Sequence, residues 1–160
     1  MEDKTTMETK QEEANLIIRL YEIRRDEEFR KAREWFDTEF NPQSAQDIIN
    51  LMSSGFASTA YFRMVLTYWE MVAALVSYGS LDAGLIHTTN VEHLRYWAKI
   101  EPFMAEVRKA FGSGFLPELE KLVKSAPDYE KRLAGWRELN KNWIAQAGGN
   151  QKTEVGQSNG

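Results

Sequence analysis

The segment from Ser58 to Tyr78 restricts the fold most, because it carries two apolar stripes at helical spacing. One stripe contains Phe62, Leu66, Trp69, Ala73 and Val76, and the other contains Tyr61, Val65, Tyr68, Val72 and Leu75. A helix that is apolar on two faces has to be packed between other elements. The charge-free run 71–81 within this region is too short to cross a bilayer, which takes about 20 apolar residues. The sequence therefore predicts one buried central helix.

The rest of the chain also has helical periodicity, and no window alternates as a strand would. Residues 12–40 are expected to form one long amphipathic helix. Ser44 followed by Asp47, and Thr89 followed by Glu92, have the spacing of N-terminal capping pairs. Pro102 is expected to kink the helix in which it lies.

These elements predict an all-α fold, a single-domain helical bundle of six or seven helices. We expect the bundle to cover residues 14–145. A polar N-terminal extension would occupy residues 1–13, and a disordered C-terminal tail residues 146–160.

Composition excludes several classes of function. The 160 residues carry a net charge of -4, without the basic excess that nucleic acids attract, so we expect no nucleic-acid partner. The chain has no Cys, which excludes disulfides, thiolate metal sites and Cys nucleophiles. Its first residues are too polar for a secretory signal, so the expected compartment is the cytoplasm.

Glu70 is the one carboxylate inside the most apolar part of the chain, and its role is open between three alternatives. A buried carboxylate needs a partner, because an unpaired one would cost several kcal/mol or take up a proton. Glu70 could form a structural ion pair with a cation such as Arg24 or Arg95, or it could face solvent. It could also bind a ligand in an interhelical pocket with Arg63 and His87.

No motif indicates catalysis or metal binding. His87 and His93 do not have the i,i+3 or i,i+4 spacing of helical metal ligands, and no H-E-x-x-H motif occurs. The G-x-S-x-G elbow and the phosphate-binding G-x-x-x-x-G-K-[ST] loop do not occur either. We therefore predict no catalytic residue, no metal and no cofactor, and the balance is against an enzyme.

Three stretches resemble, in the same order, the signatures of a bacterial all-helical family of unknown function, the 4760 family. They are "RDEEFRKAREWF", "LTYWEMVAALVSYGSLDAGLI" and "RYWAKIEPFMAEVRK". The resemblance implies a helical fold and no assigned reaction. It also implies a hydrophobic N-terminal anchor in many members, from which this chain departs because its N-terminus is polar. Family analogy is thus the one indication of membrane association, and the residues themselves do not predict it.

Aromatic residues favour a helical protein-interaction or scaffolding module. Trp35, Tyr96 and Trp136 lie off or at the edge of the best apolar stripes, where they could anchor an interface with a protein partner or a second copy. The alternative is a small-molecule-binding protein or enzyme that uses Glu70 in an interhelical pocket.

Overall fold

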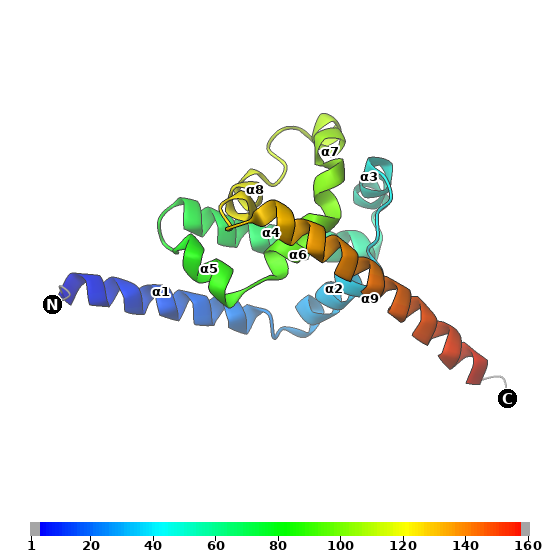
Figure 1. The fold of residues 1–160 in the computed structure, drawn as a ribbon, viewed down its shortest axis with the longest axis horizontal. Helices are drawn as coiled ribbons and strands as arrows, with labels where there is room; N and C mark the ends of the chain where they lie inside the picture. The colour runs from blue at the N-terminus through cyan, green and yellow to red at the C-terminus, as the bar shows by residue number, and fades with distance from the viewer. Residues whose placement is uncertain (1–3, 158–160) are drawn as a thin grey trace.

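The structure is a computed structural model that describes the backbone of residues 4–157 and the side chains of residues 6–149. The helices are α1 (Lys4–Ile23), α2 (Glu27–Thr38), α3 (Ala45–Ser54), α4 (Ala57–Ser77), α5 (Ala83–Thr89), α6 (Glu92–Ile100), α7 (Met104–Phe111), α8 (Pro117–Lys124) and α9 (Tyr129–Gln157) (Figure 1). The described residues form no strand, so the all-α prediction is confirmed. The expected number of six or seven helices was too low, because the chain breaks at more places than predicted.

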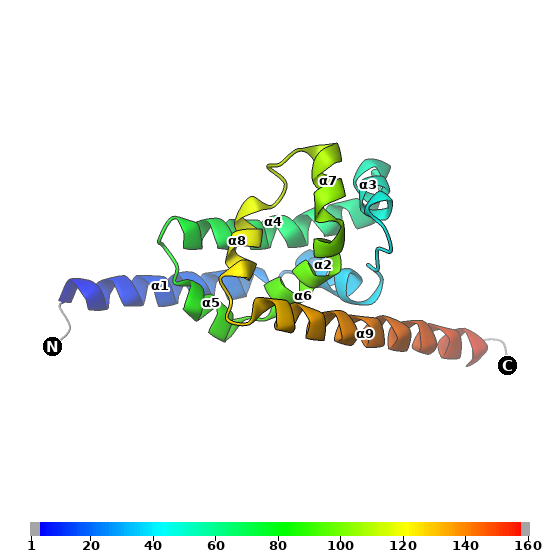
Figure 2. The ribbon, with the colours of Figure 1, turned by 45° about the horizontal axis from the view of Figure 1, so that its top comes forward.

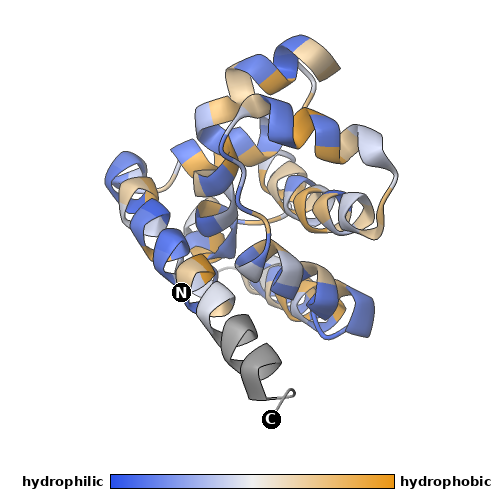
Figure 3. Cartoon of the chain, turned by 90° about the vertical axis from the view of Figure 1, so that its right-hand side faces the viewer, coloured by the Kyte–Doolittle hydropathy of each residue, from blue (hydrophilic) through white to orange (hydrophobic). Residues whose placement is uncertain are grey.

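The bundle is built around α4 and α6. Helix α4 packs against α2 and α8, and α6 packs against α9 and α8, while α3 lies on α7 and α4. Helices α1 and α9 extend beyond this bundle in opposite directions, so that the first turn of α1 and the last turn of α9 lie far apart (Figures 1 and 2). Hydrophobic and hydrophilic residues alternate along the helices, as expected for elements that are each covered on only part of their surface (Figure 3).

Two helices are buried rather than one. Helix α4 is the predicted central helix, and members of both of its apolar stripes are buried, including Phe62, Trp69 and Val72. Helix α6 is covered even more fully, since all of its residues except Arg95 are buried. The buried residues of α6 include two charged ones, Glu92 and Lys99, and these need partners within the bundle.

The expected long helix over residues 12–40 is wrong, because the chain turns at Arg24–Asp26 and forms α1 and α2. Asp26 is the N-cap of α2, and its side chain accepts a hydrogen bond from the backbone N–H of Phe29 at 3.0 Å. Helix periodicity explains the break. In a continuous helix the buried Leu20 and Phe29 would point about 180° apart, and the turn lets both face the core.

Two other local predictions are confirmed. Ser44 and Asp47 exchange the reciprocal hydrogen bonds of a capping box at the start of α3. Pro102 lies in a 3-10 turn, Glu101–Phe103, which separates α6 from α7.

The ends of the chain are more helical than expected. Helix α1 begins at Lys4, within the expected extension, and α9 continues to Gln157, across most of the segment expected to be a tail. The domain limits 14–145 stay a prediction. No helix in the described part of the chain combines the length and the apolar character needed to span a membrane.

Lys99 is a buried cation that completes the C-terminal end of α2. Its ammonium group donates hydrogen bonds to the carbonyl oxygens of Phe36 and, at 2.9 Å, Phe40. At the end of a helix the last carbonyl oxygens have no N–H partner within the helix, so they need another donor. A cation at this position also offsets the negative end of the helix dipole. Burial lowers the pKa of Lys99 to about 8.

Replacing Lys99 by Met tests this role, because Met has a similar length but cannot donate a hydrogen bond. We expect Lys99→Met to lower the free energy of unfolding by about 2 kcal/mol, since buried carbonyls would lose their donor. Urea denaturation measures the change, with Lys109→Met on the exposed side of α7 as the control, expected to stay within about 0.5 kcal/mol of the parent. Equal stability of the two variants would contradict a capping role.

Candidate functional site

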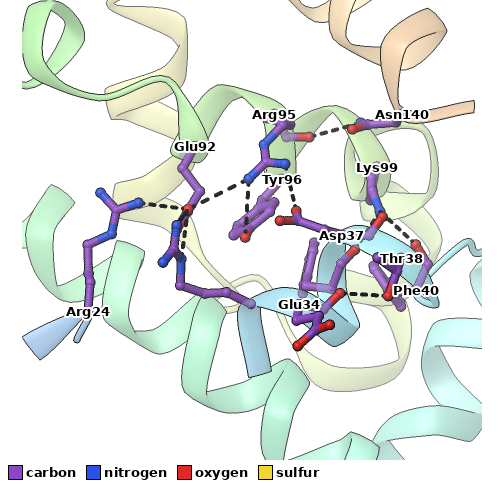
Figure 4. A network of polar contacts seen from close by, with 12 residues as sticks. Arg24, Glu34, Asp37, Thr38, Phe40, Glu92, Arg95, Tyr96, Lys99 and Asn140 are labelled. Atoms are coloured by element: carbon purple, nitrogen blue, oxygen red, sulfur yellow. Dashed lines mark hydrogen bonds and ion pairs between the residues drawn. The ribbon is translucent and has the colours of Figure 1, made fainter. Parts of the chain in front are cut away.

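Among the residues that the structure describes, the polar group with the most side-chain partners is the carboxylate of Glu92, the first residue of α6. Glu92 is 3% exposed. Its Oε2 accepts hydrogen bonds from Arg24 at 2.8 Å and from Nε and Nη2 of Arg33 at 2.9 and 2.6 Å (Figure 4). Its Oε1 accepts one from the indole N–H of Trp69 at 3.1 Å. One buried carboxylate thus joins the α1–α2 turn, α2, α4 and α6.

A second acid and a third arginine extend this cluster. Arg95 forms an ion pair with Asp37 of α2 at 2.7 Å, and it lies 3.7 Å from Glu92. Burial raises the pKa of Asp37, and the nearby Arg95 works against that rise. The guanidinium of Arg95 also lies over the Tyr96 ring, 4.8 Å from its centre. With three arginines and two carboxylates, the cluster holds an excess of positive charge.

The buried carboxylate with cationic partners is Glu92, and not Glu70 as the sequence suggested. Thr89 was expected to cap α6, with Glu92 reaching back to it, but Thr89 is the last residue of α5 and its hydroxyl donates to the carbonyl of Leu85. Val91 occupies the N-cap position of α6, so Glu92 is free to turn into the bundle. Arg24 and Arg95, considered as partners for Glu70, are partners of Glu92 instead.

Glu70 has the structural one of the three expected roles, because it joins two helices, but its partners are backbone N–H groups and not the cation that was expected. It is half-buried, and its two carboxylate oxygens accept hydrogen bonds from the backbone N–H groups of Glu118 at 3.0 Å and Leu119 at 2.7 Å. These donors belong to the first turn of α8, whose own N-cap residue, Leu116, provides no side-chain bond. Glu70 therefore caps α8 from a neighbouring helix, and its negative charge favours the positive end of that helix dipole.

The predicted ligand-binding set is not assembled. Arg63 is exposed, and among the described residues no hydrogen bond or ion pair joins the side chains of Glu70, Arg63 and His87. His87 lies on α5, where its Nδ1 is 2.9 Å from Nε2 of His93 and its Nε2 is 3.0 Å from the hydroxyl of Ser125. The two histidines form an interhelical pair, and no group of three potential metal-binding side chains occurs in the described part of the chain.

The three expected interface aromatics have different environments. Tyr96 is 0% exposed, so the prediction that it anchors an interface is wrong: α6 is covered on nearly all sides, which its sequence stripes did not show. Trp35 and Trp136 are partly buried and packed against the core. Trp35 contacts the rings of Phe36, Phe40 and Tyr61. Neither tryptophan stands free on the surface.

Two adjoining hollows lie at the Glu92 cluster. One, of about 460 Å³, is lined by Tyr21, Arg24, Arg25, Arg30 and Arg33. The other is a groove of about 330 Å³ between α1, α4 and α5. Its apolar wall consists of Ile17, Ile18, Leu20, Tyr68, Trp69, Val72 and Ile86. The two hollows share Tyr21, Arg24 and Arg25, so a basic region borders a mainly apolar one, whose lining also includes Glu22, Thr89 and Asn90.

The fold and this cluster define a class of protein, an all-helical bundle organised around a buried carboxylate and its arginines. The model of a domain of unknown function (DUF4760) matches residues 11–126, and the chain belongs to this family. The resemblance found in the three sequence stretches is thereby confirmed. Comparison with curated proteins and with solved structures found no match.

The Glu92 cluster gives a direct prediction for stability. Glu92→Gln keeps the shape of the side chain but leaves the partly buried Arg24 and Arg33 beside a neutral group, and we expect it to cost about 3 kcal/mol or more. The exposed Glu106 supplies the matched control, with Glu106→Gln expected to have almost no effect. Chemical denaturation of both variants compares the costs, and a loss below about 1 kcal/mol for Glu92→Gln would contradict the central role of Glu92.

The burial of His93 should make the stability of the fold depend on pH. Burial lowers its pKa from 6.5 to about 3, so below pH 6.5 the unfolded chain binds a proton at this position while the folded chain does not. The free energy of unfolding should therefore fall as the pH falls from about 6.5 to about 4.5, by at most about 1.4 kcal/mol per pH unit from this residue.

The variant His93→Leu removes this contribution. Its free energy of unfolding should decline less steeply over the same pH range, while His87 and the carboxylates titrate in both proteins. Parallel stability curves for the two proteins would show that His93 is protonated equally in the folded and unfolded states, contrary to this prediction.

Proposed function

We propose that this chain is a helical interaction module that self-associates through α1 and acts in the cytoplasm. The observation that carries the proposal is a row of exposed residues on α1, namely Met7, Gln11, Ala14, Ile18 and Tyr21. Their spacing of four, three, four and three is that of a coiled-coil seam. Met7, Ile18 and Tyr21 are 52%, 58% and 55% exposed.

The opposite side of α1 is already occupied. Leu20 is buried, Leu16 and Ile17 pack against the core, and the hydroxyl of Tyr68 donates to the carbonyl of Leu20 at 2.8 Å. The seam lies on the side of α1 away from these contacts, although Ile18 and Tyr21 also line a groove beside the bundle, and the N-terminal part of α1 extends beyond the bundle (Figure 1). A helix that extends from the bundle with an uncovered and mostly apolar row, Gln11 being its polar member, is well suited to pairing with another helix.

A second copy of the chain is the partner that fits this row. In an antiparallel pair centred on Ala14, Met7 of each copy would pack against Tyr21 of the other, and the small alanine would allow close approach at the crossing. The same arrangement would bring Glu8 and Arg19, on one flank of the seam, opposite each other across the pair. A two-fold axis relates such contacts, as in most homodimers.

Self-association can be tested by sedimentation velocity over a wide range of protein concentrations. The wild-type chain should form dimers, and Ile18→Glu should weaken dimer formation by about tenfold or more, because it buries a charge in the seam. Met71→Glu is the control, since Met71 is also an exposed apolar residue within a helix, 43% exposed, but lies on α4. A wild-type chain that stays monomeric at all concentrations would contradict the proposal, and so would equal effects of the two variants.

A further inference from the structure

We propose that the arginine-lined hollow and the adjoining groove form one binding site for a small phosphate-bearing amphiphile, a phosphomonoester attached to an apolar body. The phosphate would occupy the hollow, and the apolar body would lie in the groove between α1, α4 and α5. This inference does not rest on the self-association of α1, but Ile18 and Tyr21 belong to both surfaces, so a ligand in the groove and a second copy on the seam would compete for them.

The hollow has the composition of an anion site. Four of its five lining residues are arginines, and no acidic side chain lines it, although the chain as a whole has a net charge of -4. The planar guanidinium group presents paired donors that match the oxygens of a phosphate. The fifth lining residue, Tyr21, lies beside Arg24, whose guanidinium carbon is 5.2 Å from the centre of the ring.

The positive charges that line the two hollows outnumber the nearby carboxylates, which are Glu92 behind the hollow and Glu22 in the groove. Arg24 and Arg33 share the single carboxylate of Glu92, which leaves one positive charge uncompensated in that group. Arg25 and Arg30 are exposed, and within the described residues their side chains form no hydrogen bond or ion pair. A phosphate monoester carries a charge close to -2 at neutral pH, so it suits these free cations better than a carboxylate would.

The arginines at the back of the hollow are fixed in place before any ligand arrives. Arg24 donates to Asn90 at 2.8 Å as well as to Glu92, and its guanidinium carbon lies 5.9 Å from the centre of the Trp69 ring. Arg33 is held by two hydrogen bonds to Glu92. Groups held in this way lose little freedom when they bind a ligand, which favours affinity.

The groove supplies the apolar half of the site. Its floor includes the buried side chains of Leu20, Tyr68, Trp69, Val72 and Ile86. Its volume of about 330 Å³ lies at the lower end of the range for small-molecule sites, roughly 300 to 1,000 Å³. Because Arg24 and Arg25 line both hollows, a ligand with its charged group at one end could fill them together.

Isothermal titration calorimetry with monomeric n-octyl phosphate tests the site in the full-length chain. We expect saturable binding that is about tenfold or more tighter than the binding of 1-octanol or inorganic phosphate, because each of these fills only one half. The double variant R25Q/R30Q should weaken the binding of n-octyl phosphate by about tenfold or more. The control R63Q/K109Q removes two exposed cations outside the hollow and should bind as the wild type does.

Several outcomes would overturn the proposal. One is the lack of n-octyl phosphate binding, and another is binding no tighter than that of 1-octanol. Equal affinities of R25Q/R30Q and R63Q/K109Q would place the phosphate outside the hollow. Vesicles that contain phosphatidic acid test whether the protein recognises a lipid surface and not a free ligand. Binding to such vesicles without binding of monomeric n-octyl phosphate would also contradict a small-molecule site.

Discussion

The buried carboxylate of Glu92 is the interaction on which the rest of the structure depends. It is bonded to Arg24, Arg33 and Trp69, which come from three separate parts of the chain. A charge in this position is costly unless every oxygen has partners, and here both oxygens do. The turn between α1 and α2 and the start of α6 are therefore fixed relative to α4 by one group, and removal of its charge would leave two partly buried arginines, Arg24 and Arg33, without a carboxylate partner.

The position of the α1–α2 turn has consequences for the surface. Because the chain turns at Arg24–Asp26, α1 leaves the bundle with one face packed on it and the seam from Met7 to Tyr21 exposed. The same turn places Arg24 and Arg25 beside Arg30 and Arg33 of α2. Both proposed binding surfaces thus follow from a bend that Glu92 and the Asp26 cap hold in place. Neither surface involves Glu70, whose carboxylate completes the end of α8.

The sequence predicted what depends on periodicity and on neighbours along the chain. The two stripes of α4, the capping box at Ser44 and the break at Pro102 are all local patterns, and all three are confirmed. The roles of Glu70 and Glu92 depend on which helices lie beside them, and that information is not local. Thr89 and Glu92 also have the spacing of a capping pair, but Glu92 forms tertiary contacts and not a cap.

Two patterns in the sequence did contain more than we predicted from them. Between Ile23 and Phe29 the apolar face of the expected long helix shifts out of phase, which is the signal of the α1–α2 break. The cluster of Arg24, Arg25, Arg30 and Arg33 around that break could have indicated an anion site, but a charge run on a helix is more often a solvated face. The burial of Tyr96 could not have been predicted from its own sequence stripe, because α6 is covered on nearly all sides by elements that include α8 and α9.

Peptide-resolved hydrogen exchange of the Glu92→Gln protein, under conditions in which circular dichroism shows it to be folded, tests the central role of Glu92 most directly. We expect faster exchange from the end of α1 through α2 and at the start of α6, with exchange in α3 and α7 close to that of the wild type. Unchanged exchange around the α1–α2 turn, or a uniform increase over the whole chain, would contradict the claim that this one carboxylate holds the turn against the bundle.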